Sequence, residues 1–106
     1  MSLLTETIGS QYRYEKNDKW SGIVKGNDNC FYCLPSDAKQ LLKINPSNDE
    51  TTLVGEEHDD YGKWRNGFAH GDDIYGIPFF ANQFLKYNTK TGTSELVGDL
   101  GDNYEK

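Results

Sequence analysis

Two cysteines three positions apart have the spacing in this chain that most resembles a chemical site. Cys30 and Cys33 form the C-x-x-C pattern of redox and zinc sites. A structural zinc ion takes four ligands, and the sequence has neither a second cysteine pair nor a His-x-x-x-His pattern. On a strand, residues three apart point to opposite faces of the sheet. We therefore predict two structural thiols, with no metal site and no cofactor.

The acidic segment around His58 is a second candidate. Glu57, His58 and Asp59 could supply the acid–base centre of a small hydrolase-like enzyme. The alternative is an exposed, solvated acidic loop. We expect the other histidine, His70, to lie in a loop as well. Because the sequence has no Gly-x-Ser-x-Gly, phosphate-loop or EF-hand spacing, we assign no catalytic residue and keep the enzyme as an alternative.

Adjacent phenylalanines, Phe79 and Phe80, follow Pro78 in a predicted loop, where such apolar rings are costly unless they are covered. We expect this loop to open at the same end of the molecule as the acidic segment. An aromatic and acidic surface of this kind suits a partner protein, a cationic group or a sugar, as in a lectin-like module. Burial in a subunit contact is the alternative. The candidate binding set is His58, Asp59, Asp60, Tyr61, Phe79 and Phe80.

Composition narrows the classes of partner. The 106 residues carry 17 acidic and 11 basic side chains, a net charge of -6 that a phosphate backbone would repel, so nucleic acid is disfavoured. Mean hydropathy is low at -0.81, but 7 Tyr, 5 Phe and 2 Trp argue against disorder. No apolar run approaches the roughly 20 residues needed to cross a bilayer. Without a signal-peptide pattern, we expect no membrane partner and, by default, a cytoplasmic protein.

The strongest signal is an internal duplication. Residues 32–55, shifted by 43 positions, align with residues 75–98, and 10 of these 24 positions are identical. Upstream, Lys19-Trp20 recurs as Lys63-Trp64. The chain therefore divides into an N-terminal segment, 1–18, and two repeat units, 19–62 and 63–106.

Repetition itself predicts a shared structural role for several aromatic and proline residues. We expect packing between neighbouring units, with a ligand-stacking platform of exposed tryptophan as the alternative. These structural residues are Trp20, Tyr32, Pro35, Trp64, Tyr75 and Pro78.

Each unit has the signals of four short strands separated by polar turns rich in Asn, Asp and Gly. No stretch shows a sustained apolar period of 3.6 residues, so little or no helix is predicted. The predicted strands are 21–25, 30–34, 40–44 and 51–54 in the first unit, and 66–69, 74–77, 83–87 and 94–97 in the second.

Four short antiparallel strands in a tandem unit of 40 to 50 residues are typical of a β-propeller blade. The chain also resembles kelch-like propeller repeats of a largely uncharacterised type. The likeness covers nearly the whole chain, but the double glycine of true kelch repeats is missing and Cys33 replaces a glycine of the pattern. The resemblance implies a fold and brings no catalytic residue with it. It rests on Trp20-Ser-Gly-Ile-Val, Phe31-Tyr32-Cys-Leu-Pro35, Trp64, Gly67-Phe68 and Ile74-Tyr75-Gly76-Ile77-Pro78.

We therefore predict an all-β fold of two four-stranded antiparallel propeller-type blades plus an N-terminal extra strand, with a β-sandwich as the alternative. Two blades cannot close a ring, so either identical chains assemble or the sequence is part of a longer protein. The segment Leu4–Ile8 also repeats the outer-strand pattern of 51–54 and 94–97. We expect a homo-oligomer in which this segment reaches a neighbouring subunit. Three chains and six blades are favoured, and a dimer or tetramer is possible. The predicted function is a non-enzymatic binding or scaffold module.

Overall fold

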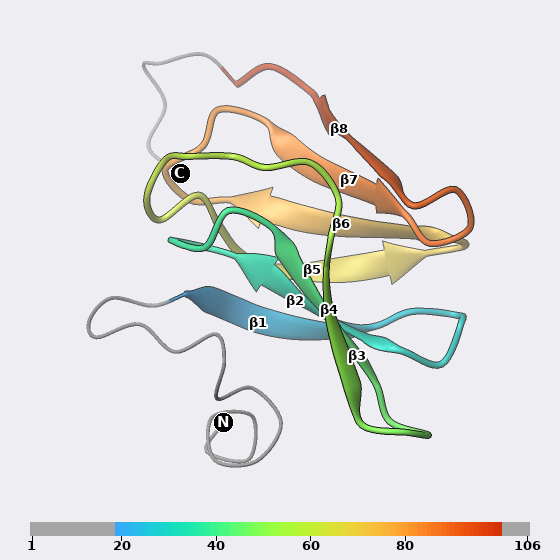
Figure 1. Cartoon of the computed structure of the whole chain (residues 1–106). Helices are drawn as coiled ribbons and strands as arrows, with labels where there is room; N and C mark the ends of the chain where they lie inside the picture. Colours follow the sequence, from blue (N-terminus) through green and yellow to red (C-terminus); the bar gives the residue numbers. More distant parts are fainter. Residues whose placement is uncertain (1–18, 101–106) are drawn as a thin grey trace.

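The computed structural model describes residues 19–100, and this part of the chain is all-β, without a helix (Figure 1). It confirms the predicted pair of four-stranded antiparallel sheets, an arrangement compatible with two blades and with a sandwich. The predicted N-terminal strand, 4–8, lies outside the described residues. The strands are β1 (Trp20–Lys25), β2 (Phe31–Pro35), β3 (Leu41–Asn45), β4 (Glu50–Val54), β5 (Trp64–His70), β6 (Asp73–Pro78), β7 (Phe84–Asn88) and β8 (Thr93–Val97).

Each sheet is a simple meander, with the order β1-β2-β3-β4 in the first and β5-β6-β7-β8 in the second. The duplication extends to an irregularity of the backbone. The pairing of β1 with β2 shifts register between Trp20 and Ile23, and that of β5 with β6 shifts between Trp64 and Gly67. The first strand of each sheet, β1 and β5, therefore carries the same bulge.

The predicted strands agree with the observed ones to within two residues at each end. One assignment is wrong: His70 is the last residue of β5, paired with Asp73, and does not lie in a loop. The hairpin turns more tightly than expected because Gly71, at φ +59°, adopts the left-handed conformation that a tight hairpin requires.

Because side chains alternate along each strand, every sheet has two faces, which we name after a repeated aromatic residue. The pairing of neighbouring strands assigns residues to each face. On the first sheet the Tyr face comprises Val24, Tyr32, Leu34 and Leu41, and the Trp face comprises Trp20, Phe31, Cys33, Leu42 and Ile44. On the second sheet the Tyr face comprises Phe68, Tyr75, Ile77 and Phe84, and the Trp face comprises Trp64, Ile74, Gly76, Leu85 and Tyr87.

The core between the sheets joins the Tyr face of the first sheet to the Trp face of the second. Strand β5 packs chiefly against β1 and β2. Leu34 is fully buried over two glycines: a Cβ at Gly76 would stand 3.0 Å from its Cδ1, and one at Gly67 would stand 3.3 Å from its Cδ2. The sheets therefore stack head to tail, with unlike faces in contact.

Candidate functional site

The loop between β6 and β7 lies against the segment that links the two sheets, as the sequence predicts. The backbone N–H of Phe80 donates to the carbonyl of Gly62 at 3.0 Å. Gly62 has φ +57°, and a Cβ there would stand 2.6 Å from the Phe80 ring. Only glycine fits under this ring. The hydrogen bond and the ring contact place the linker and the two phenylalanines at the same end of the molecule.

The two phenylalanines have different surroundings. The Arg65 guanidinium lies 3.8 Å from the centre of the Phe79 ring, so one aromatic face already holds a cation. The Phe79 and Phe80 rings are tilted at 4.6 Å from each other. Phe80 is 69% exposed and Tyr61 is 72% exposed. These two rings are the accessible aromatic groups of the predicted set.

The two aspartates of the candidate binding set have different contacts. The Asp59 carboxylate lies 3.6 Å from the Lys39 ammonium, and both side chains are largely exposed. A pair of this kind contributes about 0–1 kcal/mol. Asp60 accepts a hydrogen bond from the Lys63 ammonium through its backbone carbonyl. Neither aspartate is held in a fixed, dehydrated geometry.

His58 is half-buried, whereas the acidic residues on either side of it are exposed. Its ring meets Trp64 edge-on at 5.2 Å, and its backbone N–H donates to the Lys39 carbonyl. Burial and the neighbouring Lys63 charge lower the pKa of His58 below 6.5, against the opposing effect of Glu56 and Asp59. The imidazole is therefore neutral at pH 7.

The predicted acid–base set is not connected by hydrogen bonds around this imidazole. His58 Nε2 is buried without a hydrogen-bond partner. Asp59 pairs with Lys39, and Glu57 is exposed. A half-buried ring that packs on Trp64 serves the contact between the linker and the second sheet.

Lys63 is the residue that the sequence analysis missed. It is 2% exposed, and its ammonium donates to the carbonyls of Ser36 at 2.9 Å and Ala38 at 2.8 Å. Burial lowers the pKa of Lys63, while Asp37 and Asp60 oppose that shift. The signal was present in the repeated Lys-Trp pair, which marked only the start of each unit.

The two repeated tryptophans make equivalent hydrogen bonds but pack in different clusters, Trp64 in the core between the sheets and Trp20 on the opposite face of the first sheet. Trp20 Nε1 donates to the Gln40 carbonyl, and Trp64 Nε1 donates to the Gln83 carbonyl, both at 2.8 Å. These indole bonds fix the start of the first strand of each sheet. The two tryptophans also pair with the repeated prolines, Pro35 and Pro78.

The repeated tyrosines occupy equivalent positions in unlike surroundings. Tyr32 is fully buried between the sheets, whereas Tyr75 is half-buried and stacks on Phe68 at 4.9 Å with an interplanar angle of 11°. Phe68 is 46% exposed and Ile77 is 41% exposed. The Tyr face of the second sheet is thus accessible, while its counterpart on the first sheet forms the core.

Both cysteines are free and buried. They lie in different clusters: Cys30 belongs to the core between the sheets, and Cys33 to the cluster on the opposite face of the first sheet. Burial raises the pKa of Cys33 to about 11. Within residues 19–100 no group of three His, Cys, Asp or Glu side chains is placed to hold a metal ion.

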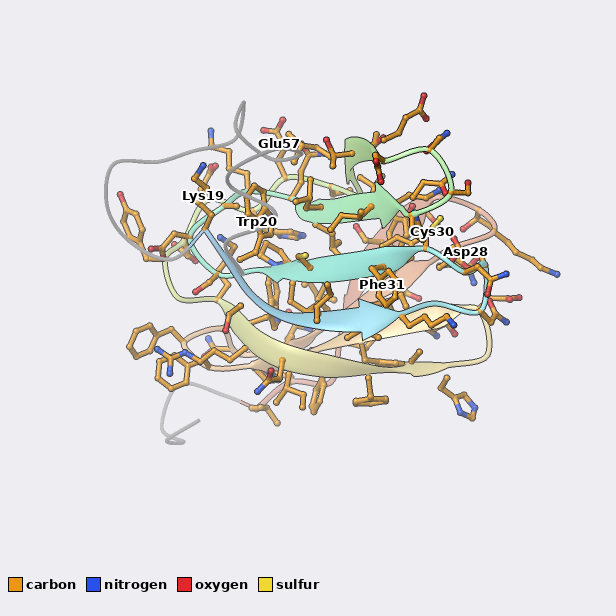
Figure 2. All side chains as sticks on the ribbon, turned by 90° about the horizontal axis from the view of Figure 1, so that it is seen from below. Lys19, Trp20, Asp28, Cys30, Phe31 and Glu57 are labelled. Atoms are coloured by element: carbon orange, nitrogen blue, oxygen red, sulfur yellow. The ribbon has the colours of Figure 1, made fainter. Side chains whose placement is uncertain are left out.

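Figure 2 shows how the labelled residues divide between the ends of the first sheet. Lys19 and Trp20 lie at one end of β1, whereas Asp28 and Cys30 lie at the other. Among residues 19–100 there is no helix with the length and apolar character to span a membrane. Neither the family models nor the curated proteins with which the chain was compared give a match.

Proposed function

We propose that this protein is a non-enzymatic, propeller-type binding or scaffold module that completes a ring by association of identical chains. Three chains, giving six sheets, are the favoured number, and a dimer or tetramer is the alternative. Rings of roughly 4 to 8 blades are the closed form of this architecture. Residues 19–100 supply two sheets, so a closed ring needs further sheets, which identical chains can provide.

The observation that supports assembly is the head-to-tail stacking of the two sheets. Contact between unlike faces leaves one face of each kind for further stacking. The accessible Tyr face of the second sheet is equivalent to the buried Tyr face of the first, and Phe68 and Ile77 on it are nearly half exposed. A sheet from a second copy, presenting its Trp face, would cover these side chains as the second sheet covers Leu34.

The contact between copies differs from the internal one in its details. Where Leu34 meets Gly67 and Gly76, a second copy would present Ile23 and Cys33 to Ile77. These larger side chains hold the sheets further apart, so the new contact does not reproduce the internal packing atom for atom.

The Trp face of the first sheet is also less accessible than the Tyr face of the second. Cys33, Leu42 and Ile44 are already shielded from solvent in the single chain. The newly buried area comes mainly from the Tyr face of the second sheet.

Light scattering across a concentration series tests the proposal with a matched pair of variants. Ile77 and Leu96 are 41% and 40% exposed and belong to opposite faces of the second sheet. Ile77→Lys places a charge in the proposed contact and should lower the assembled mass, whereas Leu96→Lys should leave it unchanged. A monodisperse monomer for the parent chain would overturn the ring and favour the sandwich.

The exposed rings of Phe80 and Tyr61 favour binding of a ligand at the end of the molecule where the loop between β6 and β7 meets the linker. Exposed aromatic rings beside acidic residues suit a neutral sugar or a quaternary ammonium group. We would titrate the chain with cellobiose and with tetramethylammonium and follow the amide signals by NMR. Loss of binding in Phe80→Ala, with the assembled mass retained, supports a ligand platform. Loss of the assembly in that variant places Phe80 in the subunit contact instead.

A further inference from the structure

The two sheets turn unlike faces outward, and these faces differ in how well they are shielded from water. On the Tyr face of the second sheet, Phe68 and Ile77 keep nearly half of their surface exposed. On the Trp face of the first sheet, Leu42 is 1% exposed and Cys33 is 3% exposed. Within residues 19–100, the cluster around these two side chains contains only residues of β1, β2 and β3. Its cover therefore comes from another part of the chain.

The covered part of the Trp face is a strip along β2 and β3, formed by Cys33, Leu42 and Ile44. Ile23 of β1 pairs with Cys33, and Leu53 of β4 pairs with Leu42, so both lie on the same face. They flank the strip and are 44% and 40% exposed. A strip two strands wide, about 10 Å, fits a single chain segment, whereas a second sheet would cover all four strands.

The segment 1–18 has the composition and the reach to supply this cover. It contains the aliphatic residues Leu3, Leu4 and Ile8, and it leads into Trp20, which packs against the strip. The eleven residues between Ile8 and Trp20 can span about 36 Å when extended, which is more than the strip requires. The other end of the chain is less suited, because residues 101–106 have no aliphatic side chain and follow the second sheet.

We infer that residues 3–8 bind the Trp face of the first sheet of their own chain, with Leu3, Leu4 and Ile8 over the strip. The surroundings of Cys33 support this placement. Burial raises the pKa of Cys33, and the positive charge of the amino terminus opposes that shift. Because such a charge effect weakens with distance, it is expected when the first residues lie on this face.

The inference concerns the single chain and goes beyond the proposed assembly. A neighbouring copy can reach the Trp face only after residues 3–8 have left it. The sequence also suggested that this segment extends to a neighbouring subunit, and the test must separate the two placements.

Methyl NMR of the intact parent chain locates the segment without any substitution. Nuclear Overhauser contacts should link the methyl groups of Leu3, Leu4 or Ile8 to those of Leu42 and Ile44. An equimolar mixture of labelled and unlabelled chains, recorded with an isotope filter, should show no such contact between copies. Contacts found only between copies, or no contact from residues 3–8 to this face, would overturn the inference.

Thiol labelling gives a second readout with a control inside the same chain. Leu4→Asp combined with Ile8→Asp should raise the rate at which a disulfide dye labels Cys33 about tenfold or more, because the thiol loses its apolar cover. Cys30, in the core between the sheets, should stay unreactive. Tandem mass spectrometry locates the label. The matched control, Thr5→Asp with Thr7→Asp, adds the same charge to the same segment and should leave both thiols unreactive.

The inference and the proposed function fail separately. If Cys33 stays unreactive in the Leu4 and Ile8 variant and the methyl contacts are absent, the inference is wrong and the proposed assembly is untouched. If both thiols react, the variant has unfolded, and the methyl contacts of the parent chain decide. A parent chain that stays monomeric overturns the assembly and leaves the cover in place.

Discussion

The Tyr32 hydroxyl donates a 2.6 Å hydrogen bond to the Asp28 carboxylate, linking the core between the sheets to the turn that joins β1 to β2. The second carboxylate oxygen of Asp28 accepts the backbone N–H of Cys30 at 3.0 Å. Burial, and then Asp28 itself, raise the pKa of Tyr32. One buried phenol thereby holds the turn through an acidic side chain and remains protonated well above neutral pH.

Tyr32→Phe should destabilise the fold by about 1.5–3 kcal/mol, because it removes a partly buried hydrogen bond to a charged acceptor. Urea unfolding followed by tryptophan fluorescence measures the change. Tyr75→Phe, at the equivalent position on the accessible face, is the control and should change the free energy of unfolding by less than about 0.5 kcal/mol. Equal losses in the two variants would contradict the role given to Asp28.

Stability should fall as the pH decreases from about 7 to 5, in part through His58. The pKa of His58 is lowered in the folded chain. As the pH falls through 6.5, the unfolded chain takes up a proton at this residue while the folded chain resists it, so the unfolded state is favoured.

His58→Phe should flatten this pH dependence, because phenylalanine keeps a ring against Trp64 and cannot be protonated. Urea titrations at several pH values between 5 and 7.5 give the slope. The control is His70→Asn, at the exposed end of β5. This variant should keep the part of the slope of stability against pH that His58 contributes. A parent-like slope in His58→Phe would refute the assignment.

Leu34→Ala should cost about 2–5 kcal/mol in the free energy of unfolding, because it leaves a cavity over Gly67 and Gly76. Ile77→Ala removes side-chain carbons at the equivalent position on the accessible face. Measured on the dissociated chain, it should cost well under half as much. Thermal and urea unfolding of both variants at a dilution that prevents assembly give the comparison. A larger loss in Ile77→Ala would show that the two Tyr faces are not related as described.

The native chain should be unreactive toward a thiol reagent such as a disulfide dye at pH 7. Both cysteines are buried, and the pKa of Cys33, about 11, leaves very little thiolate. In a denaturant, both thiols should react within minutes. Rapid reaction of one thiol in the native chain, in a colour assay with no denaturant, would show that one side of the first sheet opens readily.

The strands and turns could be predicted because their signals are local and each occurs twice. Alternation, turn residues and the two prolines placed all eight strands to within two residues. The error at His70 arose because a turn anchored by Gly71 allows β5 to extend one residue further than the alignment with the first unit suggested.

The site was only partly predictable because its important contacts join residues far apart in the sequence. Proximity of the Phe79–Phe80 loop to the linker followed from the meander. The bonds of Lys63 to Ser36 and Ala38 did not, because the repeated Lys-Trp pair marks the start of a unit and does not show which carbonyls its ammonium meets. The contact of Arg65 with the Phe79 ring was not predicted for a similar reason, since Arg65 lies on β5 and strand β6 separates it from Phe79 in the sequence.

Head-to-tail stacking also gives any assembly of this chain a polarity, with two chemically different ends. The end that presents the Phe68–Tyr75 stack accepts the Trp face of another copy, and the opposite end accepts a Tyr face. A copy altered only at Ile77 can still join through its first sheet but cannot be followed by another copy. Added in small amounts to the parent, this variant would stop the growth of the assembly. The ratio of variant to parent that prevents closure of the proposed ring would give its number of subunits.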